Sequence, residues 1–306
     1  MERVKKKRKV KKRWTPLKIM LLIALVLVVG GGGFIGYTYY QVDQTVKKIQ
    51  SPVKNTGDKV VEEQKPVSVL LLGVDQRPGE RGRSDSIMVM TLNPTRNESR
   101  LISIPRDTKV DIVGKGTNDK INHAYAFGGP QMALDTVSHL LKIRIDYFAE
   151  INLAGFTDLV NAVDGVRVKN DINFSYYEMQ FPKGELLLNG KEALAYARMR
   201  HDDPRGDFGR QIRQRQVVQA VADKMTEDFS IRRFNAVLDA LGKNVKTNVP
   251  FSVARTVATD YRDALRNVKT LSLDGSGGIE SDGIYYWHPT DKSLKEVQAQ
   301  LKEALE

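Results

Sequence analysis

The sequence predicts an α/β protein: a single α/β/α sandwich-like domain with a central mixed sheet, preceded by one N-terminal transmembrane helix. Two observations lead to this prediction. Residues 19–40 carry no charge and are mostly apolar. From Pro66 onward, short apolar runs that end at glycine or proline, as buried strands do, are mixed with longer helical patterns. Strands interspersed with helices of this length indicate one α/β domain.

The N-terminal apolar segment is long enough to cross a membrane. As a helix its 22 residues would span about 33 Å, against about 30 Å of hydrocarbon. Residues 1–18 hold ten Lys or Arg and one Glu, so they carry +9 of the net charge of +11. Basic residues beside a membrane segment stay cytoplasmic. A cleaved signal peptide is the alternative, but its apolar region would be shorter and would end in an Ala-x-Ala-like site rather than in glycines.

These features divide the chain into four parts. We expect a cytoplasmic basic tail at 1–18, a signal-anchor helix at 19–40, an extracellular stalk at 41–65 and an extracellular domain at 66–306. The protein is therefore expected in the cell membrane as a single-pass type II protein. The basic tail contains no folded nucleic-acid-binding domain and lies against the membrane, so we expect no nucleic-acid partner. The sequence carries no signal of oligomeric state.

Within the domain, periodicity and turn residues place the elements in order. Strands are expected at 67–72, 86–92, 101–104, 147–153, 166–174, 268–273 and 284–287. Helices are expected at 130–141, opened by Pro130, and at 156–163, 190–196, 208–225, 232–246 and 294–305, the last with Ser293 as N-cap. Cysteine is absent, which excludes disulfides, thiolate zinc sites and a cysteine nucleophile.

Acidic residues and arginines accompany each other at the ends of the first three predicted strands. Asp75 and Arg77 follow the first strand, Arg83 and Asp85 precede the second, and Arg106 follows the third. Residues two apart in an extended chain point to the same face, so each pair could project together. Ligands tend to bind at strand ends of α/β sheets. Surface ion pairs that merely cap the strands are the structural alternative.

A second cluster gathers arginines without lysine. Six arginines lie between residues 198 and 215, at positions 198, 200, 205, 210, 213 and 215. An extended chain at 196–200 would put Arg198 and Arg200 on one side, and Arg210 and Arg213 share a face of the following helix. The planar guanidinium binds phosphate oxygens through two hydrogen bonds, which lysine cannot do. A local anion site is favoured over a solvated basic face, whereas residues 202–204 resemble a solvated turn.

Together, the two clusters point to phosphoryl chemistry. Magnesium usually takes one or two carboxylates and completes its shell with water and phosphate oxygens. Phosphoryl transfer needs charge neutralisation and positioning more than covalent catalysis. The carboxylates would then hold a divalent cation and the arginines the phosphates.

The chain resembles the LytR–CpsA–Psr cell-wall ligases of Gram-positive bacteria. The resemblance rests on short motifs in the same order, at residues 71–77, 83–86, 103–107, 120–125, 188–190, 196–200 and 207–216. It implies transfer of an anionic, wall-teichoic-acid-like glycopolymer from an undecaprenyl-pyrophosphate carrier to peptidoglycan through a phosphodiester bond. It also implies an apolar tunnel for the lipid between the sheet and the helices.

The resemblance assigns roles to residues of this chain. Asp75 and Asp85 would coordinate Mg²⁺ or Mn²⁺. The catalytic residues would be Asp75, Asp85, Arg106 and Asp207. The pyrophosphate would be bound by Arg77, Arg83, Arg106, Arg198, Arg200, Arg210, Arg213 and Gln214.

Two other functions fit the same residues. The site could hydrolyse a polyprenyl pyrophosphate, with water in place of the sugar hydroxyl. A non-catalytic membrane receptor could bind an anionic polymer through the arginines alone. The carboxylates favour an enzyme, because a simple anion receptor has no use for acids in its site.

Overall fold

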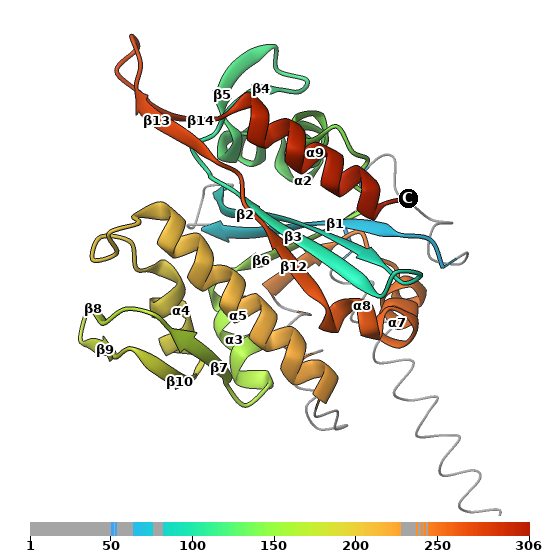
Figure 1. The fold of residues 1–306 in the computed structure, drawn as a ribbon, viewed down its shortest axis with the longest axis vertical. Coiled ribbons are helices and arrows are strands. Elements are labelled where there is room, and N and C mark those ends of the chain that lie inside the picture. The colour runs from blue at the N-terminus through green and yellow to red at the C-terminus, as the bar shows by residue number, and fades with distance from the viewer. Residues whose placement is uncertain are drawn as a thin grey trace, which may run out of the picture. The chain divides into compact units, whose positions relative to one another are not determined.

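A six-stranded mixed sheet forms the centre of the domain in this computed structural model (Figure 1). Its strand order is β11–β6–β1–β2–β3–β12. β1 is parallel to β6 and β3 is parallel to β12, while the other pairs are antiparallel. The strands are β1 (Val67–Asp75), β2 (Arg83–Asn93), β3 (Glu98–Ile104), β6 (Tyr147–Asn152), β11 (Val245–Thr247) and β12 (Val268–Leu271).

Helices cover both faces of this sheet, because its strands are apolar on both sides. Leu70 and Leu72 point to one face and pack against α2 (Ile121–Leu141) and α9 (Asp291–Ala304). Val67 and Leu71 point to the other face. That face is covered by α5 (Asp207–Glu227), α7 (Phe251–Asp260) and α8 (Arg262–Arg266). The predicted α/β fold with a central mixed sheet is therefore confirmed.

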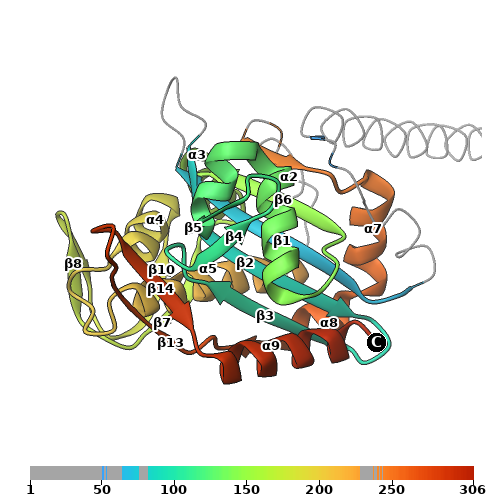
Figure 2. The same cartoon turned by 90° about the horizontal axis from the view of Figure 1, so that it is seen from above.

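A second, smaller core lies beside the sheet. It is built from α3 (Leu153–Ala162), α4 (Gly190–Arg198) and α5 together with two hairpins. The hairpins are β7 (Val166–Asn170) with β10 (Gly184–Leu188) and β8 (Phe174–Tyr176) with β9 (Met179–Phe181). Both views place the two hairpins and α4 together on one side of the molecule (Figures 1 and 2). Because α5 belongs to both cores, it forms a boundary between this lobe and the sheet.

Several sequence-based boundaries are wrong, for local reasons. α2 begins at Ile121 rather than Pro130; Gly129, with φ 67°, interrupts it, and Pro130 opens only its second half. The strand expected at 166–174 ends at Asn170. α9 is capped by Thr290, whose side chain accepts from the Ser293 N–H, and not by Ser293. The strand expected at 284–287 is β14 (Tyr285–Pro289), but its partner β13 (Gly275–Ile279) was not predicted. The hairpin of β4 (Lys109–Ile112) with β5 (Thr117–Lys120), the strands β9 and β10, and the helices α7 and α8 were not predicted either.

The structure describes residues 50, 51, 53, 64–75, 82–227, 237, 240, 242 and 244–306. The predicted tail, the anchor at 19–40, most of the stalk and most of the helix expected at 232–246 lie outside these residues. Among the helices that are described, none has both the length and the apolarity required to cross a membrane.

Candidate active site

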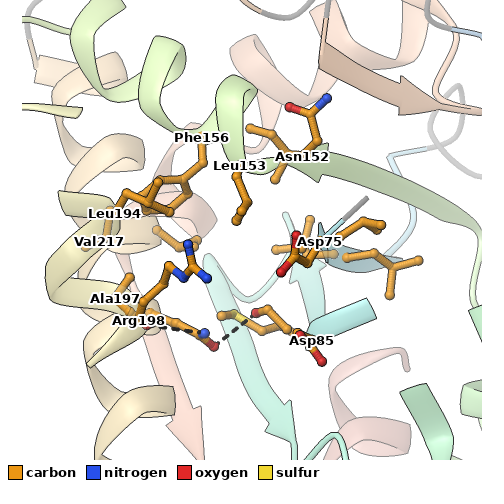
Figure 3. Close-up of a pocket in the computed structure, with 18 of the residues that line it drawn as sticks. Asp75, Asp85, Asn152, Leu153, Phe156, Leu194, Ala197, Arg198 and Val217 are labelled. Carbon is orange, nitrogen blue, oxygen red and sulfur yellow. Dashed lines mark hydrogen bonds between the residues drawn. The ribbon is translucent and has the colours of Figure 1, made fainter. Parts of the chain in front are cut away.

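A cavity of about 490 Å³ lies between the sheet and the helices α3, α4 and α5 (Figure 3). One end of it is lined by charged side chains, and we call this the polar end: Asp75, Asp85, Arg106, Arg198, Arg200 and Arg210. The remaining surface is largely hydrocarbon, and we call it the apolar wall: Leu71, Met88, Ile151, Leu153, Phe156, Leu159, Val160, Leu194, Val217, Val218 and Val221. The cavity is therefore amphipathic.

The sheet brings the acids of the polar end together. Because β1, β2 and β3 are successively antiparallel, the end of β1, the start of β2 and the end of β3 lie at the same end of the sheet. Asp75 ends β1 and lines the cavity beside Asp85, which lies near the start of β2. Arg106 follows β3, and its Nη1 lies 3.0 Å from Asp85 Oδ1. One residue from each of these three strand ends therefore lines the same cavity.

The arginines from α4 and α5 face these acids. Arg198 and Arg200 are exposed and line the cavity, and Figure 3 shows Arg198 directed into it from the wall opposite Asp75. The extended chain expected at 196–200 is wrong, since α4 continues to Arg198. Arg200 reaches the same cavity because the chain leaves the helix directly after Arg198.

The electrostatics of Arg106 and Arg210 differ. Burial lowers the pKa of Arg106, but the charges of Asp85 and Asp107 offset this and leave the pKa raised. The pKa of Arg210 is lowered, chiefly by burial and further by the positive charges of Arg106 and Arg200, although Asp207 opposes the shift. The Nε atoms of Arg106 and Arg210 are buried and have no hydrogen-bond partner among the described residues. The Nε of Arg106 lies 3.6 Å from Asp107 Oδ2. The concentration of arginine charge at this end of the cavity suits an anion.

The outer members of the predicted site do not all reach the cavity. Gln214 lines it and is held by a hydrogen bond from Ser86 Oγ to its Oε1, 3.1 Å. Asp207 does not line it; its Oδ1 lies 2.8 Å from Arg210 Nη2, so it orients that arginine. Arg83 is exposed outside the cavity, opposite Asp75 in the β1–β2 register. Arg77 lies outside the described residues.

Arg213 has a different role from the one predicted. It is completely buried and does not line the cavity. Its Nε donates to the carbonyl oxygen of Tyr196 (3.0 Å), its Nη2 to that of Met199 (2.5 Å) and its Nη1 to Asp203 Oδ2 (2.5 Å). Carbonyl groups at a helix C-terminus lack partners within the helix, and Arg213 supplies partners at the end of α4. Arg213 therefore fixes the segment that carries Arg198 and Arg200 instead of binding pyrophosphate.

Two residues without a predicted role support this site. Asn122, at the start of α2, donates from Nδ2 to Asp85 Oδ1 (3.4 Å), and its backbone N–H donates to the carbonyl oxygen of Arg106 (3.2 Å). Asp203 is buried and accepts from both Arg205 and Arg213. Asn122 lies in one of the motifs quoted for the family resemblance, which could have indicated it, whereas nothing local distinguishes Asp203 from a solvated turn.

The carboxylates fit a magnesium ion that shares its shell with a phosphate. Asp85 Oδ1 accepts from Arg106 and Asn122, while within the described part of the chain no hydrogen bond engages its Oδ2 or the carboxylate of Asp75. The same part of the chain holds no group of three or more acidic or histidine side chains that could form a cage for a metal. Two carboxylates are what Mg²⁺ commonly takes from a protein when substrate phosphates supply further oxygens.

Comparison with known proteins places the chain among relatives of similar length. It is 43% identical over 300 residues to the polyisoprenyl-teichoic acid–peptidoglycan teichoic acid transferase TagU of Bacillus subtilis (strain 168), covering 97% of this chain and 98% of that protein. The crystal structure of B. subtilis TagU superposes with a TM-score of 0.65 at 44% identity, over 79% of this chain and 97% of that one. The structure of TagT bound to LI-WTA superposes with a TM-score of 0.68 at 33% identity, over 79% and 92%. The model of the LytR_cpsA_psr family matches residues 36–303, and the chain belongs to this family.

Proposed function

We propose that the protein transfers an anionic, teichoic-acid-like glycopolymer from an undecaprenyl-pyrophosphate carrier to peptidoglycan. The observation that carries this proposal is the amphipathic cavity, whose polar end opens directly onto an apolar wall. A polyprenyl pyrophosphate has the matching form, with a highly charged head on a hydrocarbon tail. Burial of apolar chain contributes about 25 cal/mol per Å². The names of the relatives, which describe teichoic acid transfer to peptidoglycan, support the same substrates.

In the reaction, a hydroxyl oxygen of the acceptor sugar forms a bond to the phosphorus on the polymer side of the pyrophosphate. The bond from that phosphorus to the bridging oxygen breaks, undecaprenyl phosphate leaves, and the hydroxyl proton is lost to solvent. Arg198, Arg200 and Arg210 would hold the phosphate oxygens as charge moves toward the leaving group. Mg²⁺ or Mn²⁺, held by Asp75 and Asp85, would supply further charge neutralisation.

Lysine substitutions at Arg198, Arg200 and Arg210 test this arrangement. Each keeps the positive charge but loses the planar fork, so each contact with a phosphate should weaken by up to about 1.5–3 kcal/mol. We therefore expect the transfer rate to fall by more than about tenfold at one or more of these positions. Transfer of a defined lipid-linked polymer to peptidoglycan oligomers, measured at low and high salt, provides the comparison.

The exposed Arg167 of β7 is the matched control, and Arg167→Lys should leave transfer unchanged. If all three cavity variants behave like the wild type at low salt, the specific pyrophosphate contacts are absent. Release of polymer to water without attachment to peptidoglycan would identify a hydrolase. Polymer binding without any product would identify a receptor.

We further propose that residues 19–40 anchor the protein and that the domain lies outside the membrane. The uncharged apolar segment and the basic residues before it motivate this topology. Protease added to intact protoplasts should digest the domain, while a cytoplasmic marker protein stays intact. Complete protection of the domain in protoplasts whose outer surface is accessible would reverse this orientation.

A further inference from the structure

The hairpin β13–β14 lies near the start of α5 (Figure 1), and its strand β14 carries aromatic side chains. Tyr285 and Trp287 are two residues apart on β14 and so share a face of the hairpin. The Trp287 ring meets Phe208 of α5 edge to face, with 6.0 Å between the ring centroids. We call Phe208, Tyr285 and Trp287 the aromatic shelf.

The glycines of β13 allow these rings to lie across the hairpin. A Cβ at Gly277 would lie 2.0 Å from Tyr285 Oη, and a Cβ at Gly275 would lie 2.5 Å from Trp287 Cζ2. Both rings therefore occupy space that a side chain on β13 would fill. Tyr285 is 45% exposed and Phe208 is 42% exposed, so these two rings present aromatic surface to solvent, while Trp287, 4% exposed, supports them from the core.

The shelf is joined to the polar end of the cavity on both sides. The backbone N–H of Trp287 donates to the carbonyl oxygen of Asp107 (2.9 Å), the residue after Arg106. Phe208 follows Asp207, which is paired with Arg210. None of the three shelf residues lines the cavity. The shelf thus lies outside the cavity, next to the residues that would hold the pyrophosphate.

The acidic character of the chain around the hairpin favours an uncharged glycan over an anionic polymer as its ligand. Residues 270–291 contain no Lys or Arg but four acids, Asp274, Glu280, Asp282 and Asp291. Glu280 is paired with Lys109, whereas Asp282 is exposed and accepts from the Tyr286 hydroxyl. The Asp282 carboxylate disfavours a polyphosphate chain, while Lys109 and Lys120 lie over the ring of Tyr286. Uncharged sugar rings can pack their C–H faces on the aromatic rings and donate hydroxyl hydrogen bonds to the carboxylates.

We propose that the aromatic shelf binds a sugar ring of the acceptor glycan, adjacent to the ring whose hydroxyl is phosphorylated. The inference rests on the proposed function and adds the acceptor subsite to it. The shelf would align the glycan strand beside Arg106 and Arg210, so that its hydroxyl approaches the phosphorus from outside the cavity. The lipid would occupy the opposite, apolar end.

Phe208→Ala and Tyr285→Ala in the full chain test the shelf. Loss of one stacking surface should raise the KM for peptidoglycan oligomers by about tenfold, with the KM for the lipid-linked donor within about twofold of the wild type. Tyr285→Trp keeps an aromatic face and should restore the acceptor KM. The control is Leu187→Ala, which removes an apolar side chain, 59% exposed, from β10 and should change neither constant.

Binding of β-1,4-linked N-acetylglucosamine oligomers to the full chain, without donor, separates this inference from the proposed function. Weaker binding by both alanine variants supports the shelf even if no transfer is detected. Unchanged oligomer binding and unchanged acceptor KM in both variants would overturn it while transfer by the wild type stands. A raised donor KM with an unchanged acceptor KM would also overturn it and assign the shelf to the donor polymer.

Discussion

Replacing Asp75 or Asp85 by alanine is expected to reduce transfer by about a thousandfold or more, because each change removes a metal ligand of the proposed site. Both side chains lie on the cavity surface, and Asp85 is 33% exposed, so the fold should persist. Transfer rates of the two variants with Mg²⁺ present provide the measurement. Excess chelator should abolish transfer by the wild type, and added Mg²⁺ should restore it.

Two further variants serve as comparisons for this experiment. Asp111→Ala removes an exposed carboxylate from β4 and should have no effect. Asn122→Ala removes a hydrogen bond to Asp85 Oδ1 while both carboxylates remain, so the loss should be much smaller, about tenfold, and partly overcome by higher Mg²⁺. Full activity of Asp75→Ala or Asp85→Ala, or of the wild type in chelator, would remove the carboxylates from the mechanism.

Replacing Asp203 by alanine is expected to lower the free energy of unfolding by about 3–5 kcal/mol, because it leaves Arg213 buried without a counter-charge. The side chains of Asp203 and Arg213 are 0% and 1% exposed. The loss is a large share of the ~5–15 kcal/mol that typically stabilises a domain. Urea denaturation of both proteins measures it. Asp171→Ala removes an exposed partner of Arg205 and should cost under about 1 kcal/mol.

The Asp203 effect should also depend on pH. Burial alone would raise the pKa of Asp203, but the hydrogen bonds from Arg205 and Arg213 outweigh it and hold the pKa well below its usual range. A group with a lowered folded pKa contributes stability above its unfolded pKa of about 3.9 and loses it as the pH falls toward the folded value. The difference between the wild type and Asp203→Asn should therefore shrink below about pH 4. A difference independent of pH would contradict this role for the ionised carboxylate.

The central strands and the strand-end residues were predictable because they are encoded locally. β1 to β3 are apolar runs bounded by turn residues, and antiparallel pairing of neighbours in the chain brings Asp75, Asp85 and Arg106 together. Arg213 was not predictable in the same way. Its helical spacing from Arg210 led to the expectation that both arginines share a face and bind one ligand, but only Arg210 lines the cavity. Which of the two enters the interior depends on α4 and on Asp203, ten residues away.

The aromatic shelf could not be predicted from the sequence for a related reason. β13 consists largely of glycine, which has low strand propensity, so no strand was expected there. β13 pairs with β14, whose aromatic rings cover the glycines. This contact between two strands cannot be recognised from the sequence of β13 alone. The apolar wall likewise collects residues from β1, β2, β6, α3, α4 and α5, and no single segment displays it.

The edge strands of the central sheet determine how much of the chain must be present before the sheet is protected from aggregation. Its outer strands, β11 and β12, are only three and four residues long, and both come late in the sequence. Short edge strands offer few unpaired backbone groups to another chain. Until Val268–Leu271 is added, the seven-residue β3 is itself an open edge. A chain truncated before residue 268 would keep every residue assigned here to the polar end and yet expose a strand on which other chains could add.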